Sequence, residues 1–294
     1  MRSAPDETEA TSTGVNGPTE SPANGAVAVI TGASRGLGAG LAAHFAATGL
    51  RLGLCARHVP ELDPELDPEL VPDVSLSNPG SAVVAAALDV TDRDATQRFA
   101  DDVVAQFGRI DLWVNNAGLL GPIASLADAD PREVGRAVEV NVTGVLHGSA
   151  VFATHVRQRM GPGVLVNISS GAATTPYHGW AAYCASKAAV DQLTRVVALE
   201  ESEHGLRAYA LSPGLVDTDM AAAIRASDPS DFPSGHRFRR AAEEGSLNTP
   251  RWVAEHILAL AFEGYDPGTV TVRVPNEHDA GARTGGGTTW SRRQ

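Results

Sequence analysis

Tyr183 and Lys187 are the residues of this sequence whose types and spacing most directly suggest chemistry. They lie four positions apart, which on a helix places a phenol and an ammonium on one face, one turn from each other. A free tyrosine has a pKa of about 10, and a neighbouring cation is expected to lower it. The pair could then exchange protons near neutral pH. A lone Tyr-x-x-x-Lys pattern also arises by chance, with a buried tyrosine and a solvated lysine, so its meaning depends on the rest of the chain.

A glycine-rich segment, TGASRGLG at 31–38, gives a second chemical signal. Gly32, Gly36 and Gly38 lie between a strand pattern and a helix pattern, the context of a turn that holds a pyrophosphate. Glycines let the backbone approach phosphate oxygens, and the start of a helix offers free N–H groups. We therefore predict a dinucleotide site here, since a plain strand-to-helix turn would need only one glycine.

The residues after the second predicted strand bear on which dinucleotide is bound. An NAD site usually has an acidic side chain about 20 residues after the glycine loop, where it binds the ribose 2′-hydroxyl. This chain has Ala56 and Arg57 there, and Arg35 within the loop. Two guanidinium groups can bind a 2′-phosphate, so the sequence favours NADPH/NADP+ over NADH. The alternative is that both arginines face solvent.

Alternating strand and helix patterns are expected to position these residues. The pattern indicates a parallel sheet with helices on both faces, and its strands are continuously apolar, as doubly covered strands should be. We predict an α/β fold, a single doubly wound Rossmann domain with a seven-stranded parallel sheet. The predicted strands are 26–30, 51–55, 83–88, 110–114, 163–169, 206–211 and 269–274, and the predicted helices are 37–48, 94–107, 131–159, 181–203 and 250–262.

Three of the predicted helices have recognisable start signals. Thr91 followed by Asp94 predicts a capping box. Asp130 and Thr249 each precede a proline, which is favoured at the first helical position.

Composition excludes several classes of protein. The chain has 294 residues, 43% of them hydrophobic, which is enough for a sizeable core. Its net charge of −12 argues against nucleic acid or an anionic membrane as a partner. It has two cysteines, no signal-peptide pattern and no apolar run of the ~20 residues that span a bilayer, so we expect a cytoplasmic protein. Its nine histidines lack metal-ligand spacing, so no metal site is predicted.

The ordered domain is expected to cover residues 25–278. Residues 1–24 and 279–294 are rich in small and polar residues, which predicts a disordered N-terminal tail and a flexible C-terminal tail. Within the domain, 58–80 contains a proline-rich ELDP repeat, and proline at every fourth position opposes a helix. A surface insertion is favoured there over a flap that covers a cofactor or binds a partner.

These motifs together resemble the short-chain dehydrogenase/reductase family over about residues 26–274. The resemblance implies a catalytic set of Asn141, Ser170, Tyr183 and Lys187, in which Asn141 supports a proton-relay water and Ser169 is the alternative serine. It also implies a mobile substrate lid at 215–245. The implied cofactor contacts are Gly32, Ser34, Arg35, Gly36, Leu37, Gly38, Arg57, Asp89, Val90, Asn116, Ala117, Gly118, Tyr183, Lys187, Pro213, Gly214 and Thr218.

Within the family, the sequence most resembles sepiapterin reductase and the bacterial benzil (diketone) reductases. The segments that carry this resemblance are GWAAYC at 179–184, ALEE at 198–201 and PGLVDTDM at 213–220. Sepiapterin reductase holds its pterin with a carboxylate in the last strand, where this chain has Val272. A smaller apolar ketone or 1,2-diketone fits better, with Leu120, Tyr177 and Trp180 as predicted substrate contacts.

The function expected from these features is NADPH-dependent reduction of a small ketone or 1,2-diketone to a secondary alcohol. Tyr183 would donate the proton, Ser170 would bind the same carbonyl oxygen, and Lys187 would lower the phenol pKa and bind the nicotinamide ribose. The alternatives are an NAD(P)+-dependent secondary-alcohol dehydrogenase and a non-catalytic NADP(H)-binding regulator. The resemblance also implies a homodimer or homotetramer.

A short basic run remains outside this scheme. Arg237, Arg239 and Arg240 lie in the expected lid. A solvated lid face is favoured for them over a site for an acidic substrate group. His178 lies near the predicted site, and contact with substrate is the less favoured interpretation for it.

Overall fold

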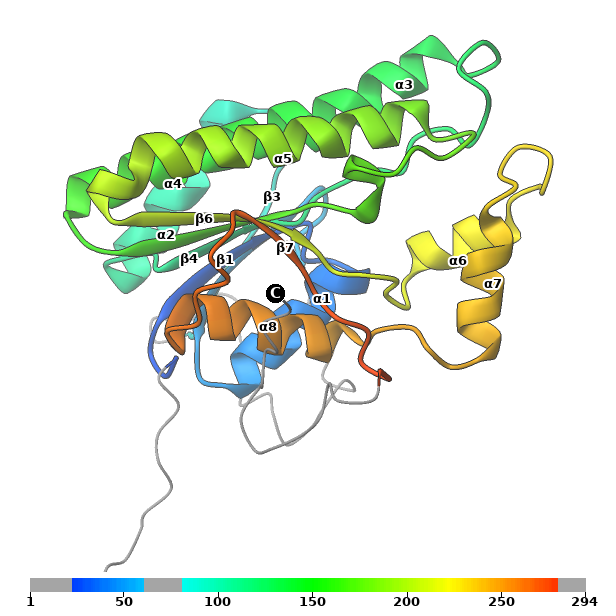
Figure 1. Cartoon of the computed structure of the whole chain (residues 1–294). Coiled ribbons are helices and arrows are strands. Elements are labelled where there is room, and N and C mark those ends of the chain that lie inside the picture. The colour runs from blue at the N-terminus through cyan, green and yellow to red at the C-terminus, as the bar shows by residue number, and fades with distance from the viewer. Residues whose placement is uncertain (1–22, 61–80, 280–294) are drawn as a thin grey trace, which may run out of the picture.

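Seven parallel strands form one sheet in the order β3-β2-β1-β4-β5-β6-β7 (Figure 1). The structure, a computed structural model, describes residues 23–60 and 81–279. Most of the predicted 58–80 insertion and of both predicted tails therefore lies outside the described residues. The sheet confirms the predicted fold class. The strands are β1 Val27–Thr31, β2 Arg51–Ala56, β3 Val83–Ala87, β4 Leu112–Asn115, β5 Gly163–Ile168, β6 Leu206–Ser212 and β7 Thr271–Arg273.

Helices cover both faces of the sheet and enclose two separate cores (Figure 1). Successive side chains of a strand point to opposite faces, so β1 sends Ala28 and Ile30 into one core and Val27 and Val29 into the other. The helices on the first face are α1 Gly36–Ala47 and α8 Pro250–Phe262, and those on the second are α2 Arg93–Phe107, α4 Gly144–Arg159 and α5 Ala181–Glu201. No helix in the described part of the chain is long and apolar enough to cross a bilayer.

Two of the three predicted helix starts are confirmed. The Asp130 carboxylate accepts from a backbone amide at the start of α3 Pro131–Val138, and the Thr249 hydroxyl does the same for α8. The predicted capping box at Thr91 and Asp94 is wrong. Asp92 caps α2 instead, and the Thr91 hydroxyl donates to Asp89 at 2.7 Å.

The predicted helix at 131–159 is divided by a π-helical turn, η1 Glu139–Thr143. Such turns insert one extra residue and often occur at functional sites. This one contains Asn141, whose side chain is fully buried.

The predicted lid contains two helices that the sequence analysis did not identify, α6 Asp219–Ala226 and α7 Gly235–Glu243. They stand apart from the sheet, beyond the carboxyl end of β6 (Figure 1). Two short 3-10 turns, η2 Gly171–Ala173 and η3 Ser202–His204, complete the described elements.

Candidate active site

One cavity of about 1020 Å³ opens at the carboxyl ends of the strands. This is the edge where ligands bind in doubly wound sheets. The cavity is lined by every predicted cofactor residue, by Ser170, Tyr183 and Lys187, and by the predicted substrate contacts Leu120, Tyr177 and Trp180. Asn141 lies behind its wall.

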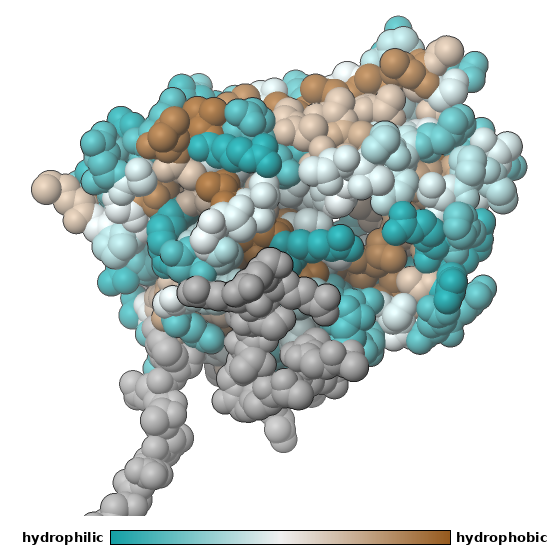
Figure 2. All heavy atoms as spheres, viewed as in Figure 1, coloured by the Kyte–Doolittle hydropathy of each residue, from teal (hydrophilic) through white to brown (hydrophobic). Residues whose placement is uncertain are grey.

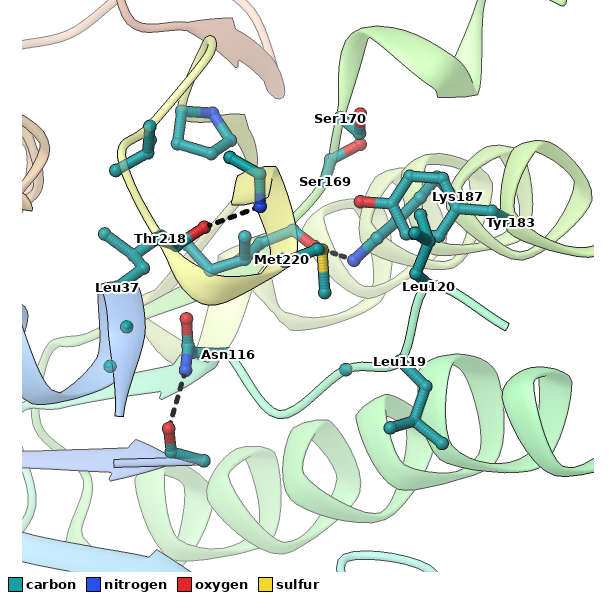
Figure 3. Close-up of a pocket in the computed structure, with 18 of the residues that line it drawn as sticks. Leu37, Asn116, Leu119, Leu120, Ser169, Ser170, Tyr183, Lys187, Thr218 and Met220 are labelled. Atoms are coloured by element: carbon teal, nitrogen blue, oxygen red, sulfur yellow. Dashed lines mark hydrogen bonds between the residues drawn. The ribbon is translucent and has the colours of Figure 1, made fainter. Parts of the chain in front are cut away.

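Ser170, Tyr183 and Lys187 come together from two elements (Figure 3). Ser170 follows β5, whereas Tyr183 and Lys187 lie one turn apart on α5. The Ser170 hydroxyl hydrogen-bonds the phenol of Tyr183. The Lys187 ammonium lies 5.6 Å from the centroid of the Tyr183 ring and donates to the carbonyl of Ile168 at 2.7 Å. The strand end and the helix therefore present two hydroxyls and one ammonium to the same cavity.

Burial is the main cause of the shifted pKa values of Tyr183 and Lys187. It raises the pKa of Tyr183 to about 12, although the hydrogen bond from Ser170 acts in the opposite direction. Burial also lowers the pKa of Lys187 to about 8, although the Asp191 carboxylate favours the charged form. The prediction that the phenol pKa lies below 10 is therefore wrong for this structure. At neutral pH the phenol holds its proton and the lysine is mostly charged.

Asn141 holds the loop that follows β4. Its side-chain oxygen accepts from the amide of Leu119 at 2.7 Å, and its side-chain nitrogen donates to the carbonyl of Leu119 at 2.7 Å. The same nitrogen donates to the hydroxyl of Ser186 on α5 at 3.1 Å. A Cβ on the neighbouring Gly118 would lie 3.3 Å from Asn141 Oδ1, so the loop passes close to this amide. Asn141 thus ties the cavity floor to the helix that carries Tyr183.

The glycine loop forms a cradle that fits a pyrophosphate. Gly32 and Gly36 have φ of 69° and 56°, values that L side chains rarely adopt. A Cβ at Gly32 would lie 2.7 Å from the Cα of Ala117, and one at Gly38 would overlap the Gly32 carbonyl. Helix α1 begins without a side-chain cap, so its first amides remain available to an anion. The residues present therefore fit a dinucleotide.

A threonine that the sequence analysis missed joins this cradle to the cavity floor. The Thr31 hydroxyl accepts from the amides of Asn116 and Ala117 at 3.0 and 3.1 Å. The Asn116 side chain donates to the carbonyls of Thr31 and Gly32 at 3.0 and 3.1 Å. The position of Thr31 at the end of β1 is the signal that could have identified it.

The polar groups at the cofactor end are partly paired. Arg35 lies 3.6 Å from Asp219 of the lid, and both side chains are exposed. Burial tends to raise the pKa of Asp89, but hydrogen bonds from Thr91 and Arg136 outweigh this effect and lower it. Arg57 lines the cavity without an ion pair to any described residue.

An aromatic cluster forms the other end of the cavity. Trp180 is buried and stacks on Phe232 at 4.3 Å between ring centroids, with Phe238 5.7 Å and Tyr177 5.2 Å from it. Phe232 and Phe238 come from the lid and were not predicted as site residues. Leu120 and Met220 pack against the same cluster. The lid is thus anchored by aromatic packing on Trp180.

Two residues considered in the sequence analysis, His178 and Val272, do not line the cavity. His178 binds the backbone carbonyl of Asp231 and does not line the cavity, as the favoured interpretation expected. Val272 is buried in the core, and Arg273 and Asp279 line the cavity near it. Asp279, which follows β7 in the chain, therefore brings a carboxylate to the cavity that the strand register did not indicate.

Ser169 contributes structure behind the site. Its hydroxyl donates to the buried carboxylate of Asp191, which lies one turn beyond Lys187 on α5. A second buried chain of hydrogen bonds runs from Asn115 to Asn167 and on to Thr194 of α5. Both connections fix α5 to the ends of β4 and β5. The sequence signal for them is a run of polar residues at otherwise apolar positions.

Comparison with known proteins gives the family. A model of short chain dehydrogenases matches residues 26–229. The chain belongs to the short-chain dehydrogenase family. A benzil reductase ((S)-benzoin forming) of Bacillus subtilis is 38% identical over 159 residues, which cover 53% of this chain and 65% of that protein. The chain thus spans just under two thirds of the length of the benzil reductases it matches.

Two further short-chain dehydrogenase matches cover more of the chain. The 3beta-hydroxysteroid dehydrogenase 1 of Eggerthella lenta is 36% identical over 240 residues, which cover 81% of this chain and 87% of that protein. The crystal structure of the KRED1-Pglu enzyme superposes with a TM-score of 0.71 at 32% identity, covering 84% of this chain and 99% of that one. The expected membership of this family is confirmed.

Proposed function

We propose that this protein is an NADPH-dependent carbonyl reductase that converts a small ketone or 1,2-diketone to a secondary alcohol. The observation that carries the proposal is that the Ser170 and Tyr183 hydroxyls share one cavity with the glycine cradle. The names of two relatives, a benzil reductase and a hydroxysteroid dehydrogenase, support a substrate with a carbonyl on an apolar skeleton.

In this proposal the dinucleotide lies between the glycine cradle and Lys187. Bound there, it supplies the hydride, and the chain supplies binding and placement. The first amides of α1 bind the pyrophosphate, and Lys187 reaches the nicotinamide ribose. The remaining proposed contacts line the same cavity: Ser34, Leu37, Val90, Asn116, Ala117, Gly118, Pro213, Gly214 and Thr218.

Tyr183 gives its proton to the carbonyl oxygen, and Ser170 donates a hydrogen bond to that oxygen as negative charge develops on it. A phenol with a pKa of about 12 is protonated at neutral pH, which suits a proton donor. Asn141 keeps the cavity floor in place for this step and supports the proton supply. Leu120, Tyr177 and Trp180 form the apolar walls around the substrate.

The NADPH preference rests on Arg35, Arg57 and the absence of an acidic side chain at Ala56. Arg57 faces the cavity with its donors free of any described carboxylate, and Arg35 is held only by an exposed contact to Asp219. Ala56→Asp combined with Arg57→Ala should shift the ratio of kcat/KM values towards NADH. An unchanged preference for NADPH would exclude binding of the 2′-phosphate by this pair.

The decisive experiment follows NADPH oxidation with benzil, aromatic ketones and sepiapterin as substrates. Tyr183→Phe should lower kcat by about 10²- to 10⁴-fold and leave NADPH binding intact. Wild-type protein that binds NADPH but reduces no carbonyl would contradict the proposed reaction and favour a nucleotide-binding regulator. Full activity in Tyr183→Phe would contradict the assignment of the proton donor.

We also propose that α4 and α5 form a homodimer or homotetramer interface. Their outer faces expose Leu146, Val196 and Leu199, and apolar surface gathers on that side of the molecule (Figure 2). Light scattering coupled to gel filtration would test this, and Leu199→Glu should lower the measured mass. A monomeric wild-type protein would contradict the proposal.

A further inference from the structure

The three arginines of helix α7 have different surroundings. Arg239 donates to the backbone carbonyl of Arg225 at 3.2 Å, and Arg240 forms an ion pair with Glu244 at 2.7 Å. Arg237 instead lines the cavity and donates to the hydroxyl of Tyr177 at 3.4 Å. It has no carboxylate partner among the described residues. Arg239 and Arg240 are therefore held by neighbouring groups of the lid, whereas Arg237 brings a positive charge to the cavity.

Packing of α7 determines where this cation lies. Phe238, the next residue, is buried and packs on Trp180 at 5.7 Å between ring centroids. Tyr177, the partner of Arg237, packs on the other side of the same cluster, 5.2 Å from Trp180. The Arg237 guanidinium is exposed, so it lies at the mouth of an otherwise aromatic pocket.

None of the three described carboxylates that line the cavity forms an ion pair with Arg237. Asp89 is bound by Arg136, and Asp219 lies against Arg35. The third, Asp279, follows β7 and forms no ion pair with Arg237. A guanidinium has five N–H donors, and Tyr177 occupies one of them with a long hydrogen bond. Arg237 can therefore still offer a pair of parallel N–H groups to a planar anion.

We propose that Arg237 binds the carboxylate of an oxo-acid substrate, an aromatic or cyclic ketone that carries its acid group away from the reacting carbonyl. This rests on the proposed carbonyl reduction. The apolar skeleton occupies the cluster around Trp180, and the ketone reaches Ser170 and Tyr183. The carboxylate lies at the mouth, where Arg237 and the Tyr177 hydroxyl both supply donors. Because Arg237 belongs to α7, the same contact holds the lid against the substrate.

Matched substrates and variants test this inference. The probes are 4-acetylbenzoate and its methyl ester, which share the ketone and the ring, carry the acid or ester group on the far side of the ring from the ketone, and differ in the negative charge. Arg237→Gln should lower kcat/KM for 4-acetylbenzoate by about 10- to 100-fold, as expected for loss of a charge-assisted hydrogen bond, and change the ester less than about twofold. Arg237→Lys should restore part of the loss. Arg240→Gln, on the same helix but paired with Glu244, is the matched control and should leave both substrates unchanged.

Equal losses for acid and ester in Arg237→Gln would overturn the inference, and so would no loss for either. A selective loss of activity with 4-acetylbenzoate in Arg273→Gln, with none in Arg237→Gln, would place the anion at β7 instead. If the wild-type protein reduces no carbonyl, the proposed function fails, and calorimetry of 4-acetylbenzoate binding to the NADP+ complex then decides the inference separately. Binding that Arg237→Gln weakens by about tenfold supports it, and binding that is absent or insensitive to the variant refutes it.

Discussion

Lys187→Met should make the protein more stable at pH 7 while removing its activity. Lys187 is 6% exposed, and burial lowers the pKa of its ammonium from 10.5 to about 8. Below pH 8 the group is charged in both the folded and unfolded states, so the folded state bears the cost of a buried charge. That cost is about 3 kcal/mol at pH 7. The variant also leaves the Ile168 carbonyl without its donor, at a cost of about 1–2 kcal/mol. The net gain is about 1–2 kcal/mol.

The pH dependence of this gain gives the sharper test. Because the folded pKa is lower than the unfolded one, the unfolded state binds more protons between pH 8 and 10.5, and wild-type stability rises with pH there. The burial cost falls to about 1–2 kcal/mol at pH 9.5, so the advantage of Lys187→Met should nearly disappear. Denaturant unfolding at pH 7 and pH 9.5 measures this, and both values lie below the folded pKa of Tyr183. Lys187→Arg, which stays charged, is the control and should show no such change relative to Lys187→Met.

The titration can also be observed directly, because Lys187 is the only lysine of the chain. Biosynthetic labelling with [ε-¹³C]lysine gives one side-chain resonance, whose midpoint should lie at about pH 8. A midpoint above pH 10, or a stability difference that stays constant between pH 7 and 9.5, would refute the buried-ammonium reasoning.

Three further predictions follow from single contacts. Asp191→Asn removes a charge that favours the ammonium, so the Lys187 resonance should titrate at a lower pH than in the wild type, and an unchanged midpoint would contradict this. Gly38→Ala places a Cβ against the Gly32 carbonyl, so NADPH binding measured by fluorescence should weaken at least about tenfold, and wild-type affinity would show that the loop can adjust. Thr249→Ala removes the cap of α8 and should cost about 1 kcal/mol, seen as a Tm lower by about 2–4 °C with activity retained. An unchanged Tm would show that the capping bond contributes nothing.

The sheet and the cofactor end of the cavity could be predicted because their signals are local. Most of the predicted contacts lie in loops that follow a strand, and the carboxyl ends of parallel strands meet at one edge. Gly32 follows β1, Asn116 follows β4, and Pro213 follows β6. Once the order of strands and helices was recognised, these loops had to converge.

The lid and the π-turn could not be predicted in the same way. Helical periodicity continues on both sides of Asn141, so the extra residue of η1 leaves no break in the apolar pattern. In the lid, Pro229 and Pro233 suggest irregular chain. The residue that organises it is Phe232, whose contact with Trp180 joins segments 52 positions apart. Such contacts depend on tertiary packing, which spacing does not encode.

The pKa of Tyr183 likewise depends on tertiary packing and could not be predicted from residue spacing alone. The four-residue spacing to Lys187 correctly predicted the neighbour, but burial decides the sign of the pKa change. Reduction of a ketone needs a protonated phenol, and a pKa of about 12 keeps that form populated at every pH near neutral. Oxidation of an alcohol needs the phenolate, which the apolar surroundings disfavour. Burial of Tyr183 therefore makes it a better proton donor than proton acceptor near neutral pH, as the proposed reduction requires.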